Sequence, residues 1–278
     1  MKKILFGFAI VFVALIGVVG TIFVYNVSEP QAKAQTENKI PKAAIIDQLY
    51  SDIPNEDFHE KATEYLETAG YKVDIFKTPE ITIDFYKKLP TMNYDFIIVR
   101  THGAADKDLV TLFTGERYQE EKYITEQLFG QAKRVTPLYE VTFDTTTTTS
   151  EWTVVNDTYR TLTTPAKIET SSSNEYFAIT PKLIDEGMQG KFENTIFILG
   201  GCNTMNSTSM AESLVKKGAS EVVGWNKEVT TFQNDMVILS LLEQMFISKN
   251  DLSTAVDFVT EKYPPNQYNF HSTILYYS

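Results

Sequence analysis

The fold is decided by two apolar stretches, Asp95-Phe-Ile-Ile-Val-Arg-Thr101 and Thr195-Ile-Phe-Ile-Leu-Gly-Gly201. Both are short and rich in β-branched residues, which is typical of strands buried in a parallel sheet. His102 and Gly103 follow the first stretch, and Cys202 follows the second. In open α/β sheets the ligand crevice lies just beyond the carboxyl ends of the strands. A Cys/His dyad at this edge is therefore the leading hypothesis for the functional site.

The same alternation of strands and helices extends outward from these two stretches. It predicts an α/β fold, a three-layer α-β-α sandwich around a mainly parallel sheet. Gly70 and Gly218 are expected to end two of the helices through left-handed caps. The expected strands are 43–50, 71–76, 95–101, 195–201, 220–225 and 273–277, and the expected helices are 58–69, 81–89, 209–217, 232–247 and 252–260.

Length and composition fit one substantial globular domain with a short appendage. The chain has 278 residues, of which 43% are hydrophobic, so it can fill a sizeable core. Its 36 acidic and 25 basic residues give a formal net charge of -11. Nucleic acid is therefore not expected as a partner, because phosphate binding depends on a dense basic surface.

The N-terminal segment is expected to contact a membrane. After Lys2 and Lys3 it runs from Ile4 to Tyr25 without a charged residue, which is long enough to cross a bilayer as a helix. The positive-inside bias predicts a cytoplasmic N-terminus and an extracytoplasmic domain. The alternative is a signal peptide cleaved near residues 32–34, which would yield a secreted protein. We assign 1–27 to the anchor, 28–42 to a linker and 43–278 to the α/β domain.

A segment at about 134–177 interrupts the α/β pattern. It is rich in Thr, Ser, Val and Tyr, and residues 152–155 and 159–162 alternate as β-hairpins do. We expect a β-rich insertion beside the site. A disordered low-complexity loop is the alternative.

The single cysteine excludes an internal disulfide, so Cys202 is either a small buried hydrophobe or a reactive thiol. Gly200 and Gly201 favour the reactive role, because they allow a sharp turn and leave room for a ligand. Taken alone, without Cys202, His102 is better explained as a histidine at a strand end that bonds to a loop.

These residues resemble the caspase-like (clan CD) cysteine peptidases, which include caspases, clostripain, gingipains and CHAT domains. The resemblance rests on Thr101-His-Gly103 and Gly201-Cys202, each at the end of an apolar strand, and covers roughly residues 43–278. The helix and strand in 210–225 are similar to those that follow the cysteine in CHAT and gingipain-like members. The sequence also resembles an archaeal branch of this family with Gly-Cys and Gly-Trp at these places.

The sequence also departs from this family. Gly201-Cys-Asn-Thr204 replaces the caspase pentapeptide around the nucleophile. His102 and Cys202 are 100 positions apart (202 − 102), against about 50 in caspases, and the β-rich insertion would absorb the excess. Substrate preference therefore does not carry over.

The resemblance implies Cys202 as the nucleophile and His102 as the general base, with no cofactor or metal. The backbone N–H groups of Gly103 and Cys202 would form the oxyanion hole, and a side chain at position 103 would crowd the tetrahedral intermediate. The substrate would be a peptide or protein. A reactive thiol of this kind is expected to have a low pKa and to alkylate quickly at neutral pH.

Substrate specificity is less well defined. If Asp235 lined the pocket for the residue before the cut bond, that pocket would prefer Arg or Lys. Asp235 on the surface of an amphipathic helix is the alternative. Trp225 is either a pocket residue or a core residue.

The remaining polar candidates have simpler expected roles. His59 is expected to be solvated on the polar side of the first helix, and His271 to be packed in the aromatic terminal segment. Asp106 and Asp108 either bind a cation or are solvated. The three histidines and one cysteine have no zinc-site spacing.

Three functions from different classes follow. The first is a membrane-anchored extracytoplasmic cysteine endopeptidase, the second a catalytically inactive caspase-like module that binds other proteins, and the third a structural domain without catalysis.

Overall fold

The computed structural model describes residues 39–137, 141–142, 167–168, 175–265 and 270–278. Helices and strands in these ranges belong to the unit Ile40–Ser278. The predicted membrane anchor, residues 4–25, lies outside them. Within the described residues no helix is both long and apolar enough to span a membrane.

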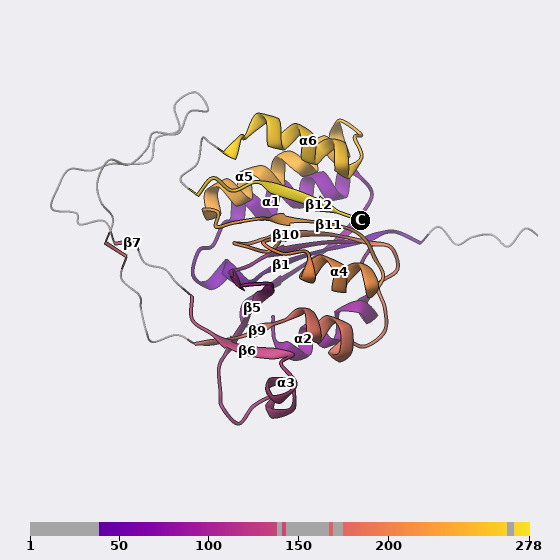
Figure 1. Cartoon of the computed structure of the whole chain (residues 1–278). Coiled ribbons are helices and arrows are strands. Elements are labelled where there is room, and N and C mark those ends of the chain that lie inside the picture. Colours follow the sequence, from indigo (N-terminus) through magenta and orange to yellow (C-terminus); the bar gives the residue numbers. More distant parts are fainter. Residues whose placement is uncertain (1–38, 138–140, 143–166, 169–174, 266–269) are drawn as a thin grey trace, which may run out of the picture. The chain divides into compact units, whose positions relative to one another are not determined.

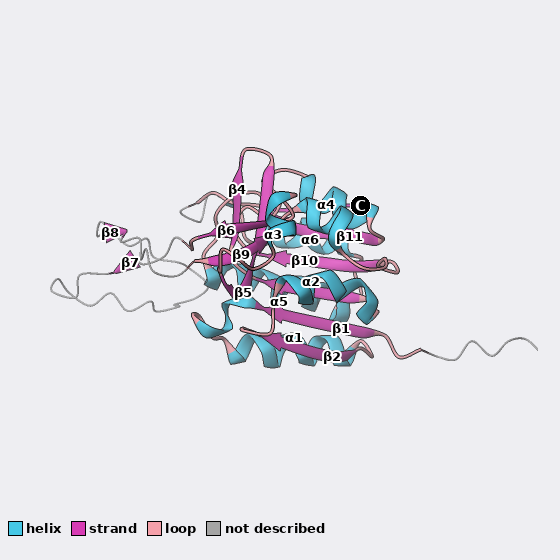
Figure 2. Ribbon diagram, turned by 90° about the horizontal axis from the view of Figure 1, so that it is seen from below, coloured by secondary structure: helices cyan, strands magenta, loops and turns pink. Residues whose placement is uncertain are grey.

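A six-stranded sheet, sheet A, forms the centre of the α/β unit. Its strand order is β12-β11-β10-β3-β1-β2, and all neighbours are parallel except β11 and β12 (Figures 1 and 2). The mainly parallel α/β prediction is confirmed. The strands are β1 (Lys42–Asp47), β2 (Lys72–Lys77), β3 (Phe96–Arg100), β10 (Thr195–Gly200), β11 (Ala219–Trp225) and β12 (Ile274–Tyr277).

The helices follow the predicted positions closely. Asn55 caps the first helix by accepting the Phe58 N–H, and Gly70 follows its end with a φ of +91°. Gly218, with a φ of +113°, follows the helix after Cys202 in the same way. The helices are α1 (Glu56–Thr68), α2 (Ile83–Lys88), α4 (Ser209–Lys216), α5 (Thr231–Leu242) and α6 (Leu252–Lys262), with the short η1 (Gln48–Ser51), η2 (Leu89–Met92), η3 (Leu183–Gly187) and η4 (Glu243–Ile247).

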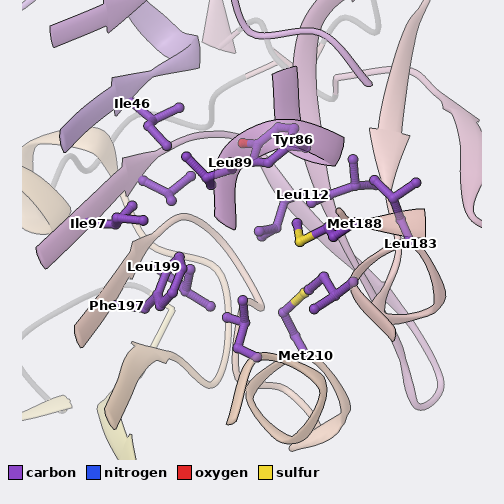
Figure 3. Close-up of a cluster of buried hydrophobic side chains, with 14 of the residues drawn as sticks. Ile46, Tyr86, Leu89, Ile97, Leu112, Leu183, Met188, Phe197, Leu199 and Met210 are labelled. Atoms are coloured by element: carbon purple, nitrogen blue, oxygen red, sulfur yellow. The ribbon is translucent and has the colours of Figure 1, made fainter. Parts of the chain in front are cut away.

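Helices pack on both faces of sheet A, because successive strand residues alternate between two apolar clusters. In β1, Ala43 and Ile45 face the cluster with α1, α5 and α6, while Ala44 and Ile46 face the cluster with α2 and α4. Figure 3 shows the second cluster, in which strand side chains such as Phe197 lie opposite Met210 of α4. Burial on both faces explains why the strands are continuous apolar runs.

A second sheet, sheet B, begins directly after His102. It is antiparallel, with the order β4-β5-β9-β6. Its strands are β4 (Gly103–Asp106), β5 (Leu109–Arg117), β6 (Ala132–Val135) and β9 (Tyr176–Ile179), and α3 (Ile124–Leu128) precedes β6. The β4–β5 hairpin was not predicted from the sequence.

The predicted insertion at about 134–177 is described only in part. Its two ends lie in β6 and β9, which pair with each other in sheet B. Val141–Thr142 and Lys167–Ile168 pair as the short strands β7 and β8. The predicted hairpins at 152–155 and 159–162 lie outside the described residues.

Candidate active site

The strands that carry His102 and Cys202 are neighbours in sheet A. β3 and β10 pair in parallel with Arg100 opposite Gly200, and the Thr101 N–H donates to the Gly200 carbonyl at 2.9 Å. His102 and Cys202 each lie two residues beyond this pair. Because parallel strands end at the same edge, the two residues emerge next to each other along the carboxyl edge of the sheet.

Glycines let the two chain segments touch after the strands end. A Cβ atom at Gly103 would lie 2.2 Å from the Cys202 carbonyl oxygen, and one at Gly201 would lie 2.4 Å from the Thr101 carbonyl oxygen. Both distances are too short for a side chain. The sequence predicts that these glycines leave room for a ligand or an intermediate. In the structure Gly103 instead makes room for the Cys202 carbonyl, and Gly201 for the Thr101 carbonyl.

His102 is held at the junction of the two sheets. Its backbone N–H donates to Gln48 Oε1 at 2.9 Å, and its backbone carbonyl accepts the Phe113 N–H at 3.0 Å. The imidazole packs on the Phe113 ring, with 5.7 Å between the ring centroids. Burial lowers the pKa of His102 to about 4, although the carboxylate of Asp52 acts in the opposite direction. The imidazole is therefore neutral at pH 7.

Cys202 is partly buried on the α5 side of sheet A. Its Sγ accepts the Val229 N–H and donates to the Val229 carbonyl, both at 3.4 Å. Burial raises the pKa of the thiol. The expected low-pKa thiol is therefore wrong for this structure, and the resting pair is a neutral thiol with a neutral imidazole.

The predicted oxyanion hole has the two backbones in contact, but in a different orientation from the expected one. Gly103 opens β4, where it lies opposite Leu112 of β5. The part of Cys202 closest to a Cβ at Gly103 is its carbonyl oxygen rather than its N–H.

A buried ionic network lies directly behind the dyad. Arg100, which is fully buried, donates from Nε and Nη2 to the two carboxylate oxygens of Asp235 at 2.9 Å each. Its Nη1 lies 3.0 Å from Asp47 Oδ1. Burial alone would lower the pKa of Arg100, yet its bonds to Asp235 and Asp47 raise it above the ordinary value. Arg100 is thus a paired structural cation.

Neutral and aromatic side chains complete this network. The amides of Asn55 and Asn234 donate to Asp235, at 2.9 and 3.1 Å. Nε2 of His59 lies 2.8 Å from Asp47 Oδ2. The prediction that His59 is solvated is wrong, since it is only 3% exposed and stacks on Tyr50.

Neither predicted pocket residue is in the expected setting. Asp235 is 5% exposed, and its carboxylate already pairs with Arg100, which argues against a pocket for substrate Arg or Lys. The alternative of a surface position is also wrong. Trp225 is 2% exposed and donates from Nε1 to Asn234, so its core alternative is confirmed.

The other candidates are at the surface. His271 is exposed, with a φ of +47°, so the packed position predicted for it is wrong. Asp106 and Asp108 are exposed at the β4–β5 turn, as the solvated alternative predicted. Among the residues that the structure describes, no group of three or more His, Cys, Asp or Glu side chains is arranged to hold a metal ion.

A cavity of about 390 Å³ opens between α1, α5 and α6. Its lining includes Asn55, Phe58, Phe232 and Asp235. His102 and Cys202 do not line it, so it is separate from the dyad.

The sequence analysis missed the supporting residues Asp47, Gln48 and Arg100. The available signal was a charged or polar residue at the end of an otherwise apolar strand. Arg100 ends the run 96–100, and Asp47-Gln48 follow the run 43–46. Buried polar groups require partners, so polar residues at adjacent strand ends could have been paired with one another.

Comparison with known proteins adds no family to this geometry. No protein-family model matches the sequence, and no curated protein matches it.

Proposed function

We propose that this chain is a caspase-like cysteine endopeptidase, anchored in a membrane by residues 4–25 with its α/β domain on the extracytoplasmic side. Cys202 is the nucleophile and His102 the general base. The observation that carries the proposal is the pairing of β3 with β10, which brings the two residues to neighbouring positions at the carboxyl edge of sheet A.

A neutral resting pair can perform this chemistry. As Sγ attacks the scissile carbonyl carbon, its proton passes to the imidazole of His102, and the C–N bond then breaks as the imidazolium protonates the leaving amine. Water hydrolyses the resulting thioester, with His102 again as the base. The lowered pKa of His102 keeps its imidazole in the unprotonated, acceptor form at pH 7, and the same shift makes it a weaker base, so in this mechanism substrate binding has to raise that pKa.

Two features of the resting site must change when substrate binds. The contacts between Sγ and the Val229 backbone have to be exchanged for contact with the substrate carbonyl. The Cys202 carbonyl has to turn away from Gly103 so that N–H groups face the oxyanion. A substrate-induced rearrangement of this turn is therefore part of the proposed mechanism.

The same contacts favour a second candidate, an inactive caspase-like module that binds other proteins. A thiol that both accepts from and donates to Val229 and has a raised pKa is stable as an uncharged buried group. In that function Cys202 serves only to hold the loop between β11 and α5.

Cleavage of a peptide library by the full chain in detergent distinguishes the two functions. We expect turnover that is lost in Cys202→Ala, by about 10⁴-fold or more. The variant must keep the thermal unfolding midpoint of the wild type to within a few degrees. A folded wild-type chain that cleaves nothing, with a thiol that iodoacetamide does not label, would identify the binding module.

A further inference from the structure

The backbone of His102 lies where the ladder between β1 and β3 has stopped. β1 ends at Asp47, and Asp47 lies opposite Arg100. The neighbouring strand therefore does not continue alongside Thr101 and His102 on this side. A buried backbone N–H without a partner is costly, so another group has to supply an acceptor.

The side chain of Gln48 supplies that acceptor. Its Oε1 receives the His102 N–H at 2.9 Å and the Thr101 hydroxyl at 3.2 Å. Gln48 is 1% exposed, so water does not compete for these bonds. The Gln48 side chain thus takes the place of a further residue of β1 as the acceptor beside Thr101 and His102.

Gln48 is itself fixed from the far side. The Thr78 hydroxyl donates to the Gln48 carbonyl at 2.5 Å, and the Thr78 N–H donates to the Asp47 carbonyl at 3.3 Å. Thr78 in turn packs against Gly115 of β5, where a Cβ atom would lie 2.9 Å from Thr78 Cγ2. The backbone of Gln48 is thus held by Thr78, which follows β2 of sheet A and packs against β5 of sheet B.

β5 also contacts His102. The Phe113 N–H holds its carbonyl, and the Phe113 ring packs on the imidazole. Gln48 therefore binds the backbone N–H of His102, and Phe113 binds its backbone carbonyl. These two bonds fix the His102 backbone, from which the imidazole projects.

We propose that Gln48 is a positioning residue, whose amide oxygen orients the backbone of His102 and so aims the imidazole along the edge that carries Cys202. The role rests on the proposed function, in which His102 must take the proton of the thiol. Misplacement of a catalytic group by about 1 Å can cost on the order of 10²-fold in rate.

The test compares three variants of the full chain. Gln48→Leu removes the acceptor, and Gln48→Glu keeps an oxygen at the same place. Gln233→Leu is the matched control, because Gln233 is also 1% exposed but its amide has no hydrogen-bond partner among the residues that the structure describes. Two quantities are measured for each variant: hydrogen exchange at the His102 backbone amide, and kcat and KM for the best library peptide.

In Gln48→Leu we expect exchange of the His102 amide to accelerate at least tenfold, with kcat about 10- to 100-fold lower and KM within about twofold of the wild type. In Gln48→Glu exchange stays protected and kcat returns to within about threefold. Gln233→Leu changes neither quantity. If Gln48→Leu does not fold, Gln48→Asn replaces it, because the shorter side chain withdraws the oxygen while keeping the amide.

Two results would overturn the inference. One is unchanged His102 exchange in Gln48→Leu or Gln48→Asn, and the other is faster exchange with no loss of kcat. Failure of the proposed function is separate: if the wild type cleaves no peptide, that function fails, and exchange at His102 alone then decides whether Gln48 holds its backbone.

Discussion

Arg100 and His102 are two positions apart at the end of one strand, yet the protein treats their charges in opposite ways. Arg100 is fully buried and remains charged, because Asp235 and Asp47 pair with it. His102 is partly buried and packs against Phe113, and desolvation lowers its pKa to about 4. Burial with charged partners preserves an ion, whereas burial against an aromatic ring keeps a titratable group neutral.

This difference separates a structural support from the edge at which the proposed dyad lies. The ionic network joins β1, β3 and α5 through Asp47, Arg100 and Asp235, and therefore holds the strand ends in register. The proposed dyad beyond it consists of two neutral groups, and transfer of the Cys202 proton to His102 would create an ion pair that the pKa shifts of both groups disfavour in the resting state. The following predictions test this contrast, beginning with the largest expected effect.

Removal of the central cation should have the largest effect on stability. Arg100→Leu leaves Asp47 and Asp235 buried without their shared partner, and we expect the free energy of unfolding to fall by about 3–5 kcal/mol. Urea denaturation measures this change. The control is Arg134→Leu, since the Arg134 side chain is 60% exposed and its ion pair with Glu175 should contribute less than about 1 kcal/mol. If the free energy of unfolding fell equally in the two variants, the buried network would contribute no more to stability than an exposed ion pair.

The pH dependence of stability should report the neutral state of His102. Its pKa is about 4 in the folded chain and 6.5 for an unperturbed histidine, so between these values the unfolded chain binds the extra proton. This contribution is fully present above pH 6.5 and is lost as the pH falls to 4. It amounts to roughly 3 kcal/mol at about 1.4 kcal/mol per pKa unit.

Urea denaturation across pH 4–7 checks this prediction as a difference between the wild type and His102→Gln, which removes the titrating group. The matched control is His271→Gln at an exposed histidine. A wild-type curve that runs parallel to the His102→Gln curve would contradict a lowered pKa at His102.

Thiol reactivity should show the smallest of the three effects. Burial raises the pKa of Cys202 and so lowers its thiolate fraction at pH 7, and iodoacetamide should therefore label the folded chain more slowly than the urea-unfolded chain. The labelling rate should rise as the pH increases beyond 9. Because Cys202 is the only cysteine, incorporation of label measures this site directly. Equal rates at pH 7 would indicate a thiol already activated in the resting state.

Much of the α/β framework could be predicted because its signals are local. Apolar runs gave the six strands of sheet A, and Gly70 and Gly218 marked the ends of α1 and α4. Sheet B was harder to predict. Its strand β4 is short and begins with Gly103-Ala-Ala, which has little β propensity by itself. This strand depends on pairing with β5, which in turn pairs with β9.

The site was predicted only as far as strand ends allow. The positions of His102 and Cys202 at two strand ends followed from the sequence, and their adjacency required the β3–β10 pairing. The two roles predicted for Asp235, a pocket residue or a surface residue of a helix, both missed its pairing with Arg100, which is 135 residues away in the chain. Long-range pairing of this kind leaves no periodic signal.

The sequence by itself determined the alternation of strands and helices, the ends of the helices and the placement of one histidine and one cysteine after apolar strands, since these features depend on neighbours within a few residues. Only the tertiary structure decided which charges are paired, which way the pKa values of His102 and Cys202 move, and how Gln48 holds the His102 backbone. The physical reason is that desolvation and pairing depend on groups brought together from distant parts of the chain.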